Sequence, residues 1–266
     1  MPRTVEVHPL DDLLDGRWTC RKFLPDKEVP FEIIESLLRA AQRTPSWSNT
    51  QPWGMWVTNA AATSRLRAEL AAHLADGGDV EPDIEFPVGY PGLYGERRRE
   101  CGHALYASLG VDRNDHGGRA QQFLRNFSFF DAPHVAVMTS PVELGTYGVL
   151  DCGLYLSTFL LAAQARGVAA APQAAPAAYS PFLHRHFGID RTRRVIATIG
   201  FGYPDLSDPV NHFRTSRAAV TENVVFVSES PQGAAADGGL LDGDRLREVA
   251  GPVDVEAQAQ GRVVGQ

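Results

Sequence analysis

Residues 45–53 read Pro-Ser-Trp-Ser-Asn-Thr-Gln-Pro-Trp, a stretch that places hydroxyl and amide side chains between two indoles. Amides such as Asn49 and Gln51 both donate and accept hydrogen bonds, which suits the hydroxyls of a polyol or the edge of a heterocycle. An indole adds a flat surface on which such a ring can stack. Taken alone, the stretch is equally well explained as a rigid connector between a helix and a strand, because Pro, Ser and Asn are ordinary turn residues.

Two arginine-rich segments lie far from this loop in the sequence. Residues 17–21 read Arg-Trp-Thr-Cys-Arg, and residues 211–217 read Asn-His-Phe-Arg-Thr-Ser-Arg. One hydroxyl in the first segment and two in the second stand between two guanidinium groups, whose paired N–H donors match the oxygens of a phosphate. Each segment on its own is more often a solvated, charged surface than a binding site. A phosphate site is therefore a hypothesis that needs a second indication.

Hydrophobic periodicity outside these segments predicts alternating helices and strands. The predicted helices cover residues 30–43, 63–73, 93–109, 118–127, 148–167 and 181–187. The predicted strands cover residues 53–58, 133–139, 168–171 and 194–201. This alternation predicts a layered α/β or α+β core rather than a sandwich or a helix bundle. Residues 1–227 would form that domain, and residues 228–266, rich in Gly, Ala, Asp and Gln, are predicted to be a mostly disordered tail.

The predicted helix at residues 148–167 is apolar enough to raise the question of a membrane span. It contains Asp151 near its start and no similar segment accompanies it, so a core helix or a dimer-interface helix is the preferred interpretation. Residues 76–91 are dense in Gly, Pro and Asp, which predicts a long irregular excursion. Because such excursions often carry function, we expect this one and its continuation to residue 99 to select the substrate, with Arg97–Arg99 favouring an acidic acceptor.

The composition limits the classes of function. The chain has 266 residues, of which 44% are hydrophobic and 21% charged, and its formal net charge of −7 disfavours nucleic acid or an anionic membrane as the main partner. Its three cysteines are widely spaced and its eight histidines are scattered, so neither a disulfide framework nor a metal site is predicted. The first ten residues contain no apolar run that would mark a secretory signal, so a reducing, cytoplasmic setting is expected.

Taken together and in this order, the motifs resemble those of the FMN-dependent nitroreductase superfamily over nearly the whole of residues 17–227. Residues 17–21 resemble the family's Arg-x-Ser-x-Arg element, with Thr19 in place of Ser. Residues 45–53 resemble its Pro-Ser-x-x-Asn-x-Gln-Pro-Trp loop, which is the most specific of the motifs. Further similar segments begin at Arg125, Asp151, Ile199 and Asn211.

The resemblance implies a nitroreductase-like fold of the α+β, or layered α/β, class. Such a fold has a central, mainly antiparallel sheet flanked by helices, with the long apolar helix in the core or at a dimer interface. It also implies a homodimer with two FMN sites, each built from both chains. Carried over residue by residue, the cofactor-binding set is Arg17, Trp18, Thr19, Arg21, Ser46, Trp47, Asn49, Gln51, Gln173, Arg214 and Arg217.

Within this implied set, one chain would supply Arg17, Thr19 and Arg21 for the phosphate, the ribityl chain or the pyrimidine edge of the flavin. Arg217, with Arg214, would add to the phosphate site, and Gln173 would lie near the reactive flavin nitrogen. The partner chain would supply Ser46 and Asn49. Trp47 departs from the family, in which this position is commonly small, and would enclose the ring.

The implied activity is that of an NAD(P)H-dependent FMN oxidoreductase that reduces nitroaromatic compounds or quinones by a two-electron, ping-pong mechanism. The electron donor would be NADH or NADPH. No catalytic side chain is assigned, because the flavin carries the redox chemistry and solvent can supply protons. Two alternatives stay open: another redox reaction on the same fold, such as dehydrogenation or reductive dehalogenation of a natural-product precursor, and an FMN-binding protein without turnover.

Overall fold

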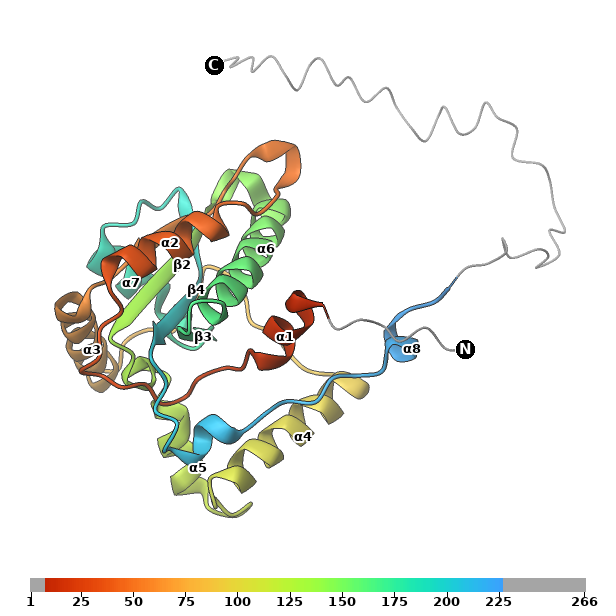
Figure 1. The fold of residues 1–266 in the computed structure, drawn as a ribbon. Coiled ribbons are helices and arrows are strands. Elements are labelled where there is room, and N and C mark those ends of the chain that lie inside the picture. Colours follow the sequence, from red (N-terminus) through yellow and green to blue (C-terminus); the bar gives the residue numbers. More distant parts are fainter. Residues whose placement is uncertain (1–7, 227–266) are drawn as a thin grey trace, which may run out of the picture. The chain divides into compact units, whose positions relative to one another are not determined.

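The computed structural model describes residues 8–226 of the chain (Figure 1). The chain divides into two units between residues 216 and 217. The first unit contains the β-sheet and the helices α1 to α7, and the second contains the short helix α8, Val220–Asn223. The predicted tail at residues 228–266 lies outside the described residues, and the predicted domain end at residue 227 stays a prediction.

Four antiparallel strands form one sheet. Their spatial order is β1 (Gly54–Val57), β2 (His134–Pro141), β4 (Arg193–Gly202) and β3 (Ala169–Gln173). Each lies within two residues, at either end, of a strand predicted from the sequence. Strands β2 and β4 read as continuous apolar runs because helices cover both of their faces. The expected α+β fold with a central, mainly antiparallel sheet is thus confirmed.

Seven α-helices belong to the described part of the first unit. They are α1 (Pro9–Gly16), α2 (Phe31–Ala41), α3 (Ala60–Ala75), α4 (Leu93–Ser108), α5 (His116–Leu124), α6 (Gly145–Gln164) and α7 (Ser180–Phe187). Helix α1 was not predicted: it has only eight residues, and although Leu10, Leu13 and Leu14 share one face, none of its residues is buried in the single chain. Helix α3 was predicted to begin at Thr63, but Asn59 caps it by accepting the Ala62 N–H at 2.9 Å. Thr63 is buried, and its hydroxyl bonds to that of Thr58 at 2.6 Å.

The helices cover the two faces of the sheet in pairs (Figure 1). Successive side chains of a strand point to opposite faces, and β2 follows this rule. Val135 and Val137 pack in a cluster with residues of α3 and α7. Ala136 and Met138 pack in a second cluster with residues of α2 and α6. The sheet therefore has a hydrophobic core on each side. Because both faces are covered, a binding site would be formed by the strand ends and the connecting loops.

Helix α6 is the long apolar helix of the sequence analysis, and it begins three residues earlier than predicted. Its inner face packs against α2 and the sheet. Its outer face exposes Tyr147, Leu150 and Leu154, which are 56%, 55% and 45% accessible in the single chain. Among the described residues, the stretch Val142–Gln164 is long and apolar enough to cross a membrane, a test that core helices also pass. The packed inner face favours the core or dimer-interface interpretation.

Candidate functional site

The segment at residues 17–21 leaves α1 and runs beside the sheet. Thr19 forms a parallel bridge with Ala170 of β3, and the Cys20 N–H donates to the Ala170 carbonyl at 3.2 Å. Cys20 is fully buried, and burial raises the pKa of its thiol to about 12. The buried thiol anchors the segment, so that Arg17, Trp18 and Arg21 lie half-buried around it.

Asn211 joins this segment to the second arginine-rich stretch. Its side chain is fully buried and accepts the Arg21 N–H at 2.9 Å. Its amide nitrogen donates to the carbonyls of Lys22 and Asp205, both at 2.7 Å. Two segments that are 190 residues apart in the sequence are thereby held side by side.

The guanidinium groups of Arg21 and Arg214 both lie at this junction. Arg21 donates to the Thr19 carbonyl at 3.2 Å, and burial lowers the pKa of its guanidinium. Arg214 donates to the Asn211 carbonyl at 2.7 Å and lies over the Trp18 ring, 4.4 Å from its centroid. Within residues 8–226 neither arginine forms an ion pair with a carboxylate. Both guanidinium groups donate to neutral backbone carbonyls, so their positive charges are not neutralised. The two arginines are therefore suited to bind an anionic ligand.

Two buried polar atoms without partners lie along β3 and the segment that pairs with it: Trp18 precedes the Thr19–Ala170 bridge, and Gln173 is three residues beyond Ala170. Trp18 Nε1 has no hydrogen-bond partner, and neither has Oε1 of Gln173. Gln173 is the last residue of β3 and is only 5% exposed, while its Nε2 donates to the Asn126 carbonyl at 2.9 Å. Since buried polar groups are nearly always hydrogen-bonded, this donor and this acceptor are groups that a bound polar ligand would satisfy.

The predicted loop at residues 45–53 has a strained backbone. Ser48, Asn49 and Gln51 have φ angles of 48°, 56° and 47°. Residues other than glycine rarely adopt this left-handed backbone conformation. Ser46 Oγ accepts the Gln51 N–H at 2.9 Å, and Gln51 Nε2 donates to Asn49 Oδ1 at 3.2 Å. Such strain persists only where surrounding contacts enforce it, and it is concentrated at binding sites.

Two charged residues, Asp151 and Arg193, hold the ends of this loop. The Trp47 N–H donates to both carboxylate oxygens of Asp151, at 3.1 and 3.2 Å. Arg193 donates to the Pro52 carbonyl at 2.8 Å and to Thr139 Oγ1 at 2.6 Å. Six residues of α6 precede Asp151, so its carboxylate lies beyond the first turn of the helix and serves the loop instead. Sequence reasoning missed Arg193, whose only signal was a cation at the first position of a buried strand.

Trp47 lies at the surface of the single chain. Its side chain is 61% exposed, and its ring lies 4.7 Å, centroid to centroid, from that of Tyr147 on α6. The loop thus presents Trp47 and Asn49 outward, beside the exposed face of α6. Whether Trp47 encloses a flavin stays a prediction.

The predicted site residues form two groups at opposite ends of α6. A Cβ on Gly16, next to Arg17, would lie 2.9 Å from Nε2 of Gln164 at the C-terminal end, whereas the loop contacts Asp151 near the N-terminal end. At 1.5 Å per residue, the 13 positions between Asp151 and Gln164 span about 20 Å. Within one chain, residues 17–21, 173 and 211–214 therefore form one group. Residues 46–51 lie apart from that group. Arg217 begins the second unit, and its predicted place beside Arg214 stays a prediction.

The excursion predicted at residues 76–91 is irregular, as expected, and leads into α4. Hydrogen bonds of Glu81 and Asp83 fix it to the region around α7 and β4. The Glu81 N–H donates to the Ala178 carbonyl at 2.9 Å, and the Asp83 N–H donates to Ser180 Oγ at 3.1 Å. The part beyond these contacts exposes large side chains, including Tyr90, over which Arg98 lies at 5.0 Å.

Comparison with known proteins agrees with this geometry. The family model described as "Nitroreductase family" matches residues 14–203. Nitroreductase NfnB of Mycolicibacterium smegmatis is 35% identical over 216 residues, which cover 80% of this chain and 91% of that protein. The 4-nitrobenzoate reductase of Pseudomonas putida is 31% identical over 208 residues, which cover 78% and 90%.

Solved structures show the same likeness. The crystal structure of the FMN-dependent nitroreductase NfnB from Mycobacterium smegmatis in complex with NADPH superposes with a TM-score of 0.77 at 34% identity. The match covers 82% of this chain and 97% of that one. Motifs, fold and relatives agree, and the chain belongs to the nitroreductase family.

Proposed function

We propose that the protein is an NAD(P)H-dependent FMN oxidoreductase that reduces nitroaromatic compounds or quinones in a two-electron, ping-pong cycle. The observation that carries the proposal is the junction of Arg21 and Arg214, two cations without carboxylate partners beside the unpartnered Trp18 Nε1 and Gln173 Oε1. Relatives named as nitroreductases and as 4-nitrobenzoate reductases support the same reaction class.

The residues present fit FMN. Its phosphate needs paired donors, which Arg17 and Arg214, with Arg217, would supply. Its pyrimidine edge carries both donors and acceptors, and the buried Arg21 and Gln173 side chains offer complementary groups. Thr19 would add a hydroxyl between the groups that bind the phosphate and those that bind the pyrimidine edge of FMN. Bound FMN would supply the hydride chemistry, accepting a hydride from the nicotinamide and passing it to the acceptor in the same place.

The chain's own contribution to the reaction is charge and orientation. Arg21 is half-buried, so its charge acts in a medium less polar than water and stabilises negative charge at the pyrimidine edge. Its position is set by the Asn211 contact to its own backbone N–H. Gln173 is oriented by Asn126, which leaves Oε1 free to accept a hydrogen bond. No side chain of this group needs to transfer a proton, because solvent can supply it.

The complete site would need a second copy of the chain. Residues 46–51 lie about 20 Å from the arginine junction along α6 of the same chain, too far for one flavin ring to touch both. The outer face of α6 exposes Tyr147, Leu150 and Leu154, an apolar surface suited to pairing. A homodimer that pairs these faces would place the loop of one chain at the junction of the other. We also place the enzyme in the cytoplasm, since its three cysteines are free thiols.

A visible spectrum with and without reductant tests the proposed function. The purified protein saturated with FMN should show bound flavin that bleaches when NADH or NADPH is added without oxygen. The colour should return when 4-nitrobenzoate, nitrobenzene or a quinone is added. A protein that takes up no FMN, or holds FMN that no nicotinamide bleaches, would contradict the proposal.

The phosphate contacts predict a separate result. Arg17→Ala and Arg217→Ala should each give a folded protein whose FMN dissociation constant is raised roughly tenfold or more, because a hydrogen bond to a charged group contributes about 1.5–3 kcal/mol. Fluorescence titration of apoprotein with FMN measures the constant. Arg39→Ala, which removes an exposed arginine paired with Glu35, is the matched control and should bind FMN as the wild type does. Equal FMN affinity in all four proteins would place the phosphate elsewhere.

A further inference from the structure

The loop at residues 45–53 carries an indole that is exposed and yet fixed at its backbone. The Trp47 side chain is 61% exposed in the single chain. Its N–H donates to both carboxylate oxygens of Asp151, and its carbonyl accepts the Thr50 N–H at 3.0 Å. Both backbone polar groups of Trp47 are therefore in use. An aromatic ring ordered in this way before binding has the preorganisation that lowers the entropic cost of taking up a ligand.

One turn of α6 supplies the contacts that fix this indole. Tyr147 and Asp151 are four residues apart, so they are neighbours on the surface of the helix. Asp151 is only 4% exposed and holds the Trp47 backbone, whereas Tyr147 is 56% exposed. The Tyr147 ring lies 4.7 Å from the indole, centroid to centroid, with the two planes tilted by 44°. Trp47 and Tyr147 thus form one exposed aromatic surface, named here the aromatic pair.

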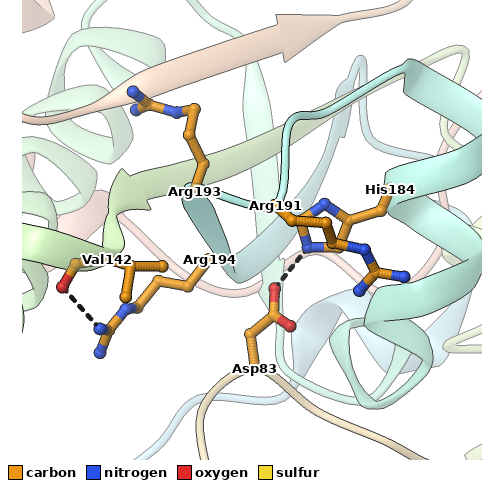
Figure 2. Close-up of a pocket in the computed structure, with 6 residues that line it drawn as sticks. All are labelled: Asp83, Val142, His184, Arg191, Arg193 and Arg194. Atoms are coloured by element: carbon orange, nitrogen blue, oxygen red, sulfur yellow. Dashed lines mark hydrogen bonds and ion pairs between the residues drawn. The ribbon is translucent and has the colours of Figure 1, made fainter.

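A second charged residue holds the far end of the loop. The Arg193 side chain points away from the neighbouring Asp83–His184 pair (Figure 2), and it donates to the Pro52 carbonyl at 2.8 Å. Between the two held ends, the backbone is left-handed at three positions that are not glycine. Because contacts with α6 and β4 enforce this conformation, the position of the indole is set by the tertiary structure and not by the local sequence.

The place of the aromatic pair in the proposed homodimer follows from α6. Tyr147 is the third residue of this helix, and its last residue, Gln164, lies beside Gly16 at the start of the arginine segment 17–21. Two α6 helices that pair antiparallel about a two-fold axis set the start of one helix beside the end of the other. The aromatic pair of one chain would then border the flavin site of its partner. This step rests on the proposed function.

The chemistry of the aromatic pair favours a flat, electron-poor ring. The face of an indole or a phenol ring carries negative electrostatic potential. A nitro group withdraws electrons from a benzene ring, so the face of a nitroaromatic ring is electron-poor and stacks favourably on an indole. An acceptor without a ring, such as the octahedral ferricyanide anion, offers no flat face and gains nothing from this surface.

We propose that Trp47, supported by Tyr147, stacks on the ring of a nitroaromatic acceptor at the partner's flavin site and determines the specificity for that acceptor. The indole then serves the binding of the acceptor and not that of FMN. Asp151 is a positioning residue in this arrangement, because it acts through the backbone of Trp47.

The test compares the wild type with Trp47→Ala, Trp47→Phe and Asp151→Asn, each saturated with FMN. One equivalent of dithionite reduces the bound flavin without oxygen, so that no nicotinamide has to bind first. Stopped-flow absorbance then follows reoxidation by nitrobenzene or by ferricyanide, and fluorescence titration of each apoprotein gives the FMN dissociation constant. Phe31→Ala is the matched control, since it removes another aromatic ring, 72% exposed, at the start of α2.

The expected result is a selective loss. In Trp47→Ala, the second-order rate constant for nitrobenzene should fall about tenfold, because the stacking surface is gone. The rate constant for ferricyanide and the FMN dissociation constant should each change less than about twofold. Trp47→Phe keeps a ring and should restore most of the nitrobenzene rate. Asp151→Asn keeps one oxygen for the Trp47 N–H and should lie between the two, while Phe31→Ala should match the wild type.

Three results overturn the inference. The first is an equal nitrobenzene rate constant in the wild type and Trp47→Ala. The second is an equal loss with ferricyanide, which a displaced loop would produce. The third is a raised FMN dissociation constant in Trp47→Ala, which would show that the indole covers the flavin itself. In all three, the wild type still reduces nitrobenzene and the proposed function stands. A reduced wild-type flavin that no nitroaromatic compound or quinone reoxidises contradicts the proposed function, and the inference with it.

Discussion

Replacing Leu150 and Leu154 together by glutamate should give a monomeric protein that no longer retains FMN and has lost at least about 99% of its nitroreductase activity. Both side chains are about half exposed on the outer face of α6, so the substitutions leave the core of the chain unchanged. In a homodimer paired through this face, four carboxylates would enter an apolar interface, and like charges at an interface cost several kcal/mol. Because each FMN site would be built from both chains, loss of the dimer removes half of each site.

Sedimentation velocity measures the association state, and flavin absorbance after gel filtration measures retained FMN. Ala61→Glu/Ala68→Glu is the matched control, because these alanines lie seven residues apart on the exposed side of α3 and add the same charge. That control should remain dimeric, yellow and active. A Leu150→Glu/Leu154→Glu protein that is dimeric and retains FMN would show that another surface forms the dimer.

Asn211→Ala should destabilise the chain by about 3–5 kcal/mol and weaken FMN binding at the same time. The side chain is fully buried and makes three hydrogen bonds, to the Arg21 N–H and to the carbonyls of Lys22 and Asp205. Removing it leaves the Arg21 N–H unpaired, which costs about 1–3 kcal/mol. The carbonyls of Lys22 and Asp205 keep backbone partners, but each loses a hydrogen bond that contributes about 0.5–1.5 kcal/mol. Arg21 also loses the contact that holds its backbone at the junction, so the affinity for FMN should fall.

Urea unfolding gives the free-energy change, and fluorescence titration gives the FMN dissociation constant. Asn59→Ala is the control, since it removes one exposed amide that caps α3, which should cost about 1 kcal/mol and leave FMN affinity unchanged. Asn211→Asp separates the two roles further. The new carboxylate still accepts the Arg21 N–H, but its second oxygen faces two carbonyl oxygens to which it cannot donate. This variant should therefore also be less stable than the wild type. An Asn211→Ala protein no less stable than Asn59→Ala would mean that the two segments are held together by other contacts.

Local sequence patterns were sufficient for most of the secondary structure. Strands β2 and β4 are continuous apolar runs, which only a strand covered on both faces explains in a layered fold. Helix α2 shows a hydrophobic repeat that places Ile34, Leu37 and Ala41 on its buried side. Helix α1 was missed although Leu10, Leu13 and Leu14 repeat at helical spacing, because a pattern of eight residues is too short to stand out from a loop.

The motifs predicted the chemistry of the site without its geometry. Two pairs of arginines and an amide-rich loop indicated a phosphate and a heterocycle, and their order along the chain indicated the family. The same motifs did not reveal Asn211 as the link to Arg21, or Arg193 as the residue that holds Pro52. Asn211 was one polar residue among several, and Arg193 was one of three nearby arginines.

The sequence by itself thus determined the elements, their class of fold and the functional groups available, because each depends on residues close together in the chain. Only the tertiary structure decided which groups meet. The contacts of Asn211 with Arg21, of Arg193 with Pro52 and of Trp47 with Asp151 join residues 190, 141 and 104 positions apart. Such pairs arise from the packing of the sheet between its helices, and no local pattern of hydrophobic or charged residues specifies them.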